Sequence, residues 1–352
     1  MMTNKRLALA IMAIFTLLLL AACGTGEESS SGSDSSQNTG ESNDTEGDSE
    51  ELYTIGATQI VEHPSLDAAF EGFKEAIADA GLNVEYDFQN AQGDQNNTSI
   101  IGNNFVAERV DLIFANSTQS SLGALQATKK AGANIPIVFT SVTDAVDAGL
   151  VEAMDQPGEN ITGVVDLHPD AIVNTIGFID TYFEGAKVGL IYNAGEANAV
   201  TQIEAVKAAV EGTSLSTVER TVATSAEVQQ AATTLVGEAD VFYIITDNTV
   251  VSALDTVIGV ANDQDIPLIV GEPNSVEKGG FATYGIDYHT IGYRTGEMAV
   301  EILKGEKTTK DIPVEIPPSM QLFINKEAAE EQGVEWNAEW DEKAQFLETK
   351  TE

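Results

Sequence analysis

The feature that most restricts the fold is an alternation of short apolar runs with longer amphipathic stretches along most of the chain. Apolar runs of about four to eight residues are typical of buried strands, and apolar residues at every third or fourth position are typical of helices. Strands that alternate with helices favour βαβ units, in which helices cover a parallel sheet. In the first half these predictions are Leu52–Thr58, Leu66–Ala80, Val84–Phe88, Ile100–Arg109, Leu112–Ala115, Ser120–Ala131 and Ile137–Thr140.

The same order of elements restarts in the second half. Three segments have counterparts at offsets of 133, 129 and 131 residues. Chance matches would scatter, so this near-constant spacing indicates a structural duplication. The pairs are Ile55–Gln59 with Val188–Tyr192, Leu112–Ala115 with Val241–Ile245, and Ile135–Phe139 with Ile266–Val270.

We therefore predict an α/β fold of two Rossmann-like lobes, each a parallel sheet flanked by helices. The segments that follow the second repeat are too short for a third domain, and we expect them to cross between the lobes in a multi-strand hinge. They are a helix at Thr290–Lys304, extended segments at Val314–Ile316 and Leu322–Ile324, and a short helix near Glu327–Glu331. The expected lobes are 52–163 with about 285–318, and 164–284 with about 319–345, with crossings near Asn160–Val164, Phe281–Ile286 and Pro317–Met320.

The N-terminus has the layout of a secretory signal peptide over residues 1–22. Lys5 and Arg6 precede an apolar stretch, Leu7–Leu20, that is too short to span a bilayer. Cys23 is the only cysteine and directly follows two alanines, as in the lipobox where the thiol receives a diacylglyceryl group. The alternative is an ordinary signal peptide with an incidental cysteine. Residues 24–51 lack aliphatic and aromatic side chains, which predicts a disordered acidic linker. We expect a lipid-anchored protein on the extracytoplasmic face of the membrane, of the Gram-positive type.

Charge excludes two classes of partner. The chain has 17 Lys and Arg against 56 Asp and Glu, a formal net charge of −39. From Leu52 onward there are still 15 basic and 47 acidic side chains. Such an excess of negative charge disfavours nucleic acid and anionic membrane surfaces.

Polar side chains gather directly after the predicted strands. In open parallel sheets, ligands bind beyond the carboxyl ends of the strands, so these residues form the candidate site. Asp247 is the candidate for a ligand ammonium group, and the absence of Lys and Arg here weighs against phosphate while leaving a neutral sugar open. Each residue could instead cap the next helix. The candidates are Gln59, Ser117, Thr118, Ser141, Thr143, Asn193, Glu196 and Asp247.

Signals for catalysis are weak. His63, His168 and His289 lie far apart in the sequence, and no cysteine remains besides Cys23. Neither a zinc site nor a Cys–His nucleophile can be assembled from neighbouring residues, and no glycine-rich phosphate loop is present. We expect no enzyme activity, no metal and no cofactor, and we expect His63 and His168, each of which precedes a proline, to shape turns.

Several motifs resemble the tryptophan/tyrosine-type substrate-binding proteins of ABC transporters. The resemblance covers roughly Tyr53 to Gly333. It rests on Gln59 with His63-Pro64 and Leu66-Asp67, Asn90–Asp94, Ile135–Val151, Pro157–Gly163, Tyr192–Asn198, Asp247-Asn248 and Gly285–Tyr288.

The resemblance implies a periplasmic-binding-protein type I fold, a permease and an ATPase as partners, and an amino-acid ligand, with aromatic ones prominent. It places the eight candidate residues around that ligand. One departure is Asn116-Ser117-Thr118-Gln119, where many relatives have a Thr-Pro turn. Two other functions remain open: a sugar- or nucleoside-binding protein of the same fold, and a ligand-sensing surface receptor without transport. We expect a monomer.

Overall fold

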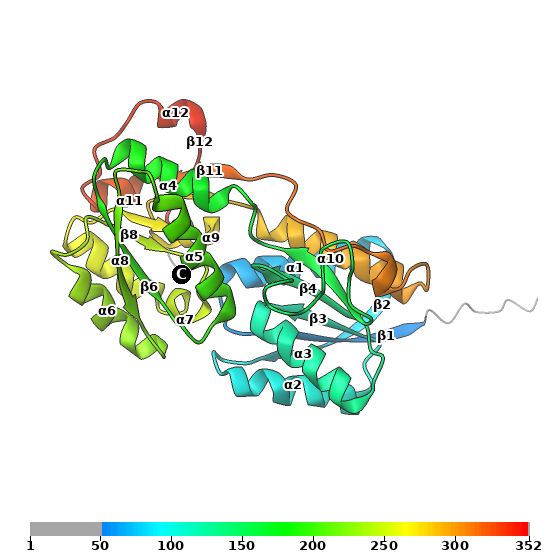
Figure 1. The fold of residues 1–352 in the computed structure, drawn as a ribbon. Coiled ribbons are helices and arrows are strands. Elements are labelled where there is room, and N and C mark those ends of the chain that lie inside the picture. Colours follow the sequence, from blue (N-terminus) through cyan, green and yellow to red (C-terminus); the bar gives the residue numbers. More distant parts are fainter. Residues whose placement is uncertain (1–50, 351–352) are drawn as a thin grey trace, which may run out of the picture. The chain divides into compact units, whose positions relative to one another are not determined.

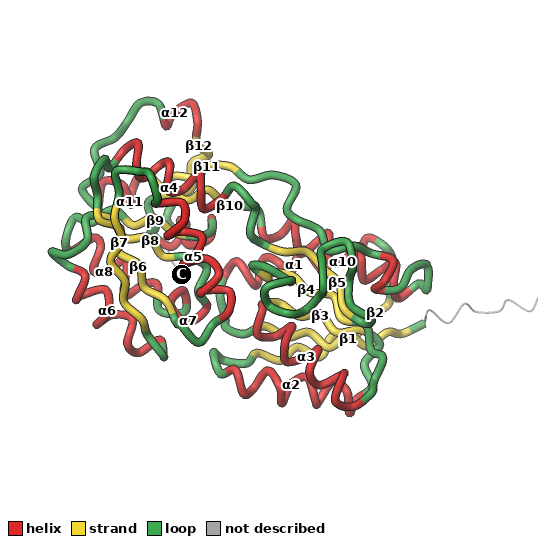
Figure 2. The backbone as a smooth tube through the Cα atoms, in the orientation of Figure 1, coloured by secondary structure: helices red, strands yellow, loops and turns green. Residues whose placement is uncertain are grey.

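A computed structural model describes residues 51–350, and these form an α/β structure with two sheets. The predictions for the signal peptide, for Cys23 and for the linker up to residue 50 fall outside the described residues. Within 51–350, no helix is both long and apolar enough to cross a membrane. Figure 2 shows the strands of each sheet with helices on both sides, as the alternation predicts.

The first sheet has five parallel strands in the order β2-β1-β3-β4-β5. The inner strands β3 and β4 and the edge strand β5 are buried along their whole length, as expected when helices cover both faces of a parallel sheet. Helices α1 and α10 lie on one face and α2 and α3 on the other (Figure 1). We call this sheet and its helices lobe 1. Its elements are β1 (Leu52–Gln59), α1 (Pro64–Asp79), β2 (Asn83–Asn90), α2 (Gln95–Glu108), β3 (Leu112–Asn116), α3 (Thr118–Ala131), β4 (Ile137–Val142), β5 (Ile161–Val165), α10 (Tyr288–Leu303) and η2 (Thr309–Asp311).

The second sheet has seven strands in the order β12-β11-β10-β9-β8-β6-β7. Only β11 is antiparallel to a neighbour, β10. Helices α4 and α5 cover one face, and α6 and α8 cover the other. We call this sheet and its helices lobe 2. Its elements are α4 (Ala171–Tyr182), β6 (Lys187–Tyr192), α5 (Ala197–Val210), β7 (Ser216–Thr221), η1 (Ser225–Glu227), α6 (Val228–Leu235), β8 (Val241–Ile244), α7 (Asn248–Val251), α8 (Leu254–Asp263), β9 (Leu268–Val270), α9 (Pro273–Lys278), β10 (Ala282–Gly285), β11 (Gln321–Asn325), α11 (Lys326–Glu331), α12 (Trp340–Lys343) and β12 (Ala344–Leu347).

The two sheets repeat one topology. The order β2-β1-β3-β4-β5 in the first corresponds to β7-β6-β8-β9-β10 in the second. The three sequence pairs with near-constant offsets lie on β1 and β6, on β3 and β8, and on β4 and β9. The predicted duplication is thus visible in the strand order, and the carboxyl ends of equivalent strands carry equivalent loops.

The chain passes between the sheets three times. After β5 it enters α4, which packs on lobe 2, and after β10 it returns to α10, which contacts β4 and β5. The last passage follows Glu315, whose only strand-like contact is an isolated parallel bridge to Val164. The extended segment predicted at Val314–Ile316 thus pairs with β5 through one bridge, which does not add a sixth strand to the first sheet.

Two helices of lobe 1, α1 and α10, approach each other very closely. A Cβ atom added at Gly292 would lie 1.9 Å from the carbonyl oxygen of Ala69, and one at Gly72 would lie 2.1 Å from that of His289. Only glycine permits this backbone contact. The close packing fixes the start of α10, and with it the position of Tyr288.

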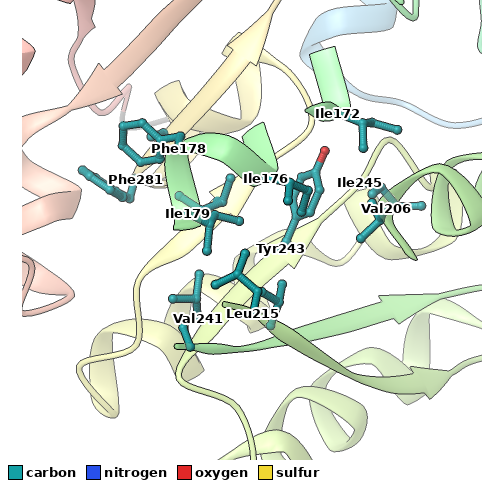
Figure 3. Packing of buried hydrophobic residues seen from close by; sticks show 14 of the residues in the cluster. Ile172, Ile176, Phe178, Ile179, Val206, Leu215, Val241, Tyr243, Ile245 and Phe281 are labelled. Atoms are coloured by element: carbon teal, nitrogen blue, oxygen red, sulfur yellow. The ribbon is translucent and has the colours of Figure 1, made fainter. Parts of the chain in front are cut away.

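An aromatic cluster closes the core of lobe 2. Figure 3 shows Phe178 and Phe281 side by side in this core, together with aliphatic side chains of α4 and α5. Trp340, which is 1 % exposed, packs against both rings at centroid distances of 5.7 and 5.4 Å. Trp336 meets Trp340 edge to face at 5.2 Å. The residues after the last crossing thus complete the core of this lobe.

Candidate functional site

Polar side chains line the carboxyl edge of the first sheet because three strand ends are in register. Gln59 is paired with Asn116, and Asn116 with Thr140. The Asn116 side chain donates a hydrogen bond to the carbonyl of Leu66 (2.7 Å) and accepts one from the Ser141 hydroxyl (2.7 Å). Asn116 therefore fixes the start of α1 relative to the end of β4.

Beyond this edge lies a small cavity to which both lobes contribute. Its volume is about 30 Å³, which is room for about two water molecules. Lobe 1 supplies the start of α1, the end of β4 and the start of α10; lobe 2 supplies α5 and the loops that follow β8 and β9. The lining residues are His63, Ser65, Leu66, Ser141, Thr143, Asp166, Asn198, Thr246, Asn248, Val251, Glu272 and Tyr288.

His63 faces the cavity as a neutral imidazole. Its Nδ1 accepts the backbone N–H of Ser65 at 3.3 Å and therefore carries no proton, so the proton lies on Nε2. Burial lowers the pKa of His63 to about 4. Within the described part of the chain Nε2 has no hydrogen-bond partner, and Oε1 of Glu272 lies 3.8 Å from it. His63 thus presents an unpaired N–H donor.

Asp166 presents the complementary group. Its Oδ2 accepts the Tyr288 hydroxyl at 2.7 Å, whereas its buried Oδ1 has no partner among residues 51–350. Burial raises the pKa of Asp166 to about 6. A buried carboxylate oxygen without a donor is unfavourable, and such atoms usually have a partner in the working molecule. Asp166 therefore presents an unpaired acceptor to the same cavity.

Glu272 is the second buried carboxyl group of the cavity. Its two oxygens accept the backbone N–H groups of Ser275 (2.8 Å) and Asn274 (2.7 Å) at the start of α9. Burial raises the pKa of Glu272 to about 7. None of the described residues that line the cavity is Lys or Arg. Elsewhere in 51–350, no three His, Cys, Asp or Glu side chains come together as a metal site requires.

A second small cavity adjoins the first on the side of the crossings. The two cavities share Asp166, Thr246 and Tyr288. The remaining lining is mainly apolar or aromatic and includes Leu167, Ala171, Ile172, Tyr243 and Tyr284. In Figure 3 the hydroxyl end of Tyr243 points toward Ile172. Together the cavities have a polar part with unpaired groups and an apolar part beside it.

The structure brings only part of the predicted site to this cavity. Ser141 and Thr143 line it. Gln59 and Asn193 line a separate open groove of about 1050 Å³, and Glu196 lines a smaller one of about 90 Å³.

The other three candidates are buried and line none of these spaces. Ser117 caps α3 through a hydrogen bond from the N–H of Ser120, and Thr118 follows it as the first residue of that helix. Asp247 caps α7: Oδ1 accepts the N–H of Val250 (2.9 Å) and Oδ2 accepts the N–H of Asn193 (2.6 Å). Each carboxylate oxygen of Asp247 thus accepts a backbone N–H within lobe 2, and its contact with a ligand ammonium group stays a prediction.

Sequence reasoning missed the groups with free hydrogen-bonding capacity. His63 was expected only to shape a turn; it does cap α1, but it also faces the cavity. Asp166 follows β5, a strand that the sequence analysis did not include, and Tyr288 begins the helix after the second crossing. A rule that examines the residue after every strand, the fifth included, would have found Asp166.

Comparisons with known proteins agree with this architecture. Residues 54–345 match the family model for ABC transporter substrate binding proteins. The chain is 40 % identical over 330 residues to the tyrosine-binding protein of Clostridioides difficile strain R20291, covering 92 % of this chain and 91 % of that protein.

Two solved structures allow a comparison of conformation. A complex with L-Trp from Streptococcus pneumonia has 30 % identity and a TM-score of 0.79, with 84 % of this chain and all of that chain covered. A ligand-free, open substrate-binding protein with adhesive properties from Clostridium difficile has 38 % identity but a TM-score of only 0.62, with 85 % and all covered. This chain therefore overlays more closely on the L-Trp complex than on the open form. The chain belongs to the ABC transporter substrate binding protein family and is an extracytoplasmic solute-binding protein of the periplasmic-binding-protein type I fold.

Proposed function

We propose that this protein binds a free aromatic α-amino acid in the cavity between its lobes and delivers it to an ABC permease with its ATPase. The observation that carries the proposal is the pair of unpaired buried atoms. Asp166 Oδ1 accepts the ligand ammonium group, and the Nε2–H of His63 donates to the ligand carboxylate. A zwitterion supplies both partners at once, whereas a neutral sugar supplies no charge to match Asp166.

The apolar cavity next to Asp166 takes the aromatic side chain. Its walls include Leu167, Ile172, Tyr243 and Tyr284, which match a ring in size and polarity. The named ligands of two relatives support this choice, since one is a tyrosine-binding protein and another was solved with L-Trp. Each cavity alone is too small for an amino acid with the side chains as they lie here, so the ligand enters an open form, and the lobes close around it with the two adjoining cavities joined into one.

For this motion we assign lobe 1 to about 52–165 with 286–318, and lobe 2 to about 166–285 with 319–347. Contacts to ligand come from both lobes, as a ligand-driven closure requires. Ser141 and Thr143 are retained as contacts from lobe 1. We further propose that Cys23 carries the lipid anchor and that the acidic linker keeps the body near the permease.

The test is calorimetric titration of the chain from residue 24 onward, which contains every described residue, with the twenty amino acids, sugars and nucleosides. We expect binding of Tyr, Trp or Phe, and ligand at 100 times its dissociation constant should stabilise the fold by about 2.7 kcal/mol. Binding of sugars or nucleosides alone would refute the amino-acid assignment. Aromatic amino acids with a blocked amino group test the ammonium contact, because they should lose affinity while their ring is unchanged.

A further inference from the structure

Gln119, the second residue of α3, makes all of its side-chain hydrogen bonds to lobe 2. Its Nε2 donates to Oε2 of Glu196 (2.9 Å) and to Oδ1 of Asn198 (2.9 Å). Its Oε1 accepts from Nδ2 of Asn248 at 3.2 Å. The side chain is 4 % exposed, so these bonds are sheltered from water. A residue of lobe 1 whose two N–H groups and carbonyl are all used by the opposite lobe is placed to hold the lobes together.

The carboxylate of Glu196, one acceptor for Gln119, is held in place by hydrogen bonds within lobe 2. Oε1 of Glu196 accepts the N–H and the hydroxyl of Thr249 (2.9 and 2.7 Å), and Oε2 accepts the N–H and the side-chain amide of Asn248 (3.1 and 2.9 Å). These donors all belong to lobe 2, so the carboxylate keeps its place when the lobes separate. Gln119 adds the donor from lobe 1, and the filled carboxylate has little capacity left for a ligand.

Two other side-chain hydrogen bonds cross between the lobes nearby. Nε2 of Gln202 donates to the hydroxyl of Thr143 at 3.1 Å, and the hydroxyl of Tyr288 donates to Asp166 at 2.7 Å. In both bonds the lobe-1 partner, Thr143 or Tyr288, lines the cavity itself. The side chain of Gln119 does not line the cavity that contains Asp166 and His63, whereas two of its partners, Asn198 and Asn248, do. Gln119 can therefore act on the ligand only through the groups of lobe 2 that it holds, and not by direct contact.

We propose that Gln119 is an affinity-determining residue that acts by clasping the lobes closed and does not touch the ligand. The proposal rests on the proposed function in one respect, namely that ligand binding is coupled to lobe closure. A clasp made only of protein groups stabilises the closed form whether or not a ligand is present. It therefore raises affinity by the same factor for every ligand of the cavity, because it increases the fraction of binding-competent protein.

The experiment compares Gln119→Ala and Gln119→Glu with the wild type. Loss of a sheltered hydrogen bond to a charged group should weaken binding of Tyr, Trp and Phe about tenfold in the alanine variant, by one common factor. The glutamate variant sets like charges against each other at Glu196 and should weaken binding further. Gln126→Ala is the matched control, since Gln126 lies on the exposed side of the same helix and should leave affinity unchanged.

Small-angle X-ray scattering without ligand provides the second readout. Both Gln119 variants should have a larger radius of gyration than the wild type and the Gln126→Ala control, because the closed form loses its clasp. Equal radii would overturn the proposal, and so would an affinity loss that differs among the three ligands, since Gln119 would then touch the ligand. If none of the amino acids binds the wild type, the proposed function fails, while the scattering comparison still decides whether Gln119 holds the lobes.

Discussion

Replacing Asp166 by Asn should weaken ligand binding and raise the free energy of unfolding of the ligand-free protein. The cavity leaves Oδ1 of Asp166 without a donor, and burial raises the pKa of its carboxyl group from 3.8 to about 6. One unit of pKa shift corresponds to about 1.4 kcal/mol, so the ionised group destabilises the empty protein at pH 7 by up to about 3 kcal/mol. Asn keeps an acceptor for the hydroxyl of Tyr288 but carries no charge.

The sign of the pH dependence follows from the raised pKa. Below about pH 4 the carboxyl group is neutral in both the folded and the unfolded protein and does not lower the free energy of unfolding. As the pH rises from about 4 to about 6 the unfolded chain loses this proton before the buried group ionises, and the free energy of unfolding of the wild type falls relative to that of the Asn variant. The free energy of unfolding of the Asn variant, minus that of the wild type, should therefore increase between pH 4 and pH 6 and stay constant above pH 7. The ligand affinity of the Asn variant should fall by roughly thirtyfold or more, because the ammonium group of the ligand loses a charged partner worth about 2–3 kcal/mol.

Urea unfolding without ligand at several pH values and calorimetric titration with Tyr, Trp and Phe measure the two effects. Asp170→Asn is the matched control, because the side chain of Asp170 is 70 % exposed and should leave stability and affinity nearly unchanged. An Asp166→Asn variant that binds amino acids as tightly as the wild type, with no gain in stability at pH 7, would refute the reasoning.

Three further predictions follow from the site and from the packing of the helices. Calorimetry at pH 5 and pH 7 should show tighter amino-acid binding at pH 7, since Asp166 must lose its proton to hold an ammonium group, and the Asp166→Asn variant should lack this difference. Gly292→Ala should lower the free energy of unfolding in urea by about 1–3 kcal/mol through the clash with Ala69, whereas Gly177→Ala, with no atom within 4 Å of its new Cβ, should not destabilise. Asp247→Ala should lower the unfolding free energy by about 1–2 kcal/mol through loss of a helix cap, and proteolysis should show earlier cleavage near α7.

The strand and helix pattern could be predicted because the buried strands are short, apolar and regularly spaced. The duplication gave an internal check, since β3 and β8 occupy the same place in their sheets. The strand β12 was missed because its residues are only partly buried and show no apolar run. It forms by pairing with β11, a contact between distant segments that local pattern does not contain.

The sequence led to only part of the cavity lining. The rule that ligands bind beyond the carboxyl ends of strands led to Ser141 and Thr143, which line the cavity. It also led to Asp247, but whether a carboxylate after a strand caps a helix or faces a ligand depends on which backbone N–H groups reach it. Here the N–H of Asn193 comes from a neighbouring strand end, 54 residues away in sequence. Asp166 acquires its role only from the path of the chain after β5.

Both tryptophans of the chain, Trp336 and Trp340, belong to the aromatic cluster that closes lobe 2, and neither lines the cavity. Intrinsic tryptophan fluorescence therefore reports on the packing of lobe 2 alone. Circular dichroism follows the helices of both lobes. If the lobes unfold separately, fluorescence and circular dichroism will give different midpoints in one urea titration. The order of the two midpoints will show which lobe is the less stable, without any added label.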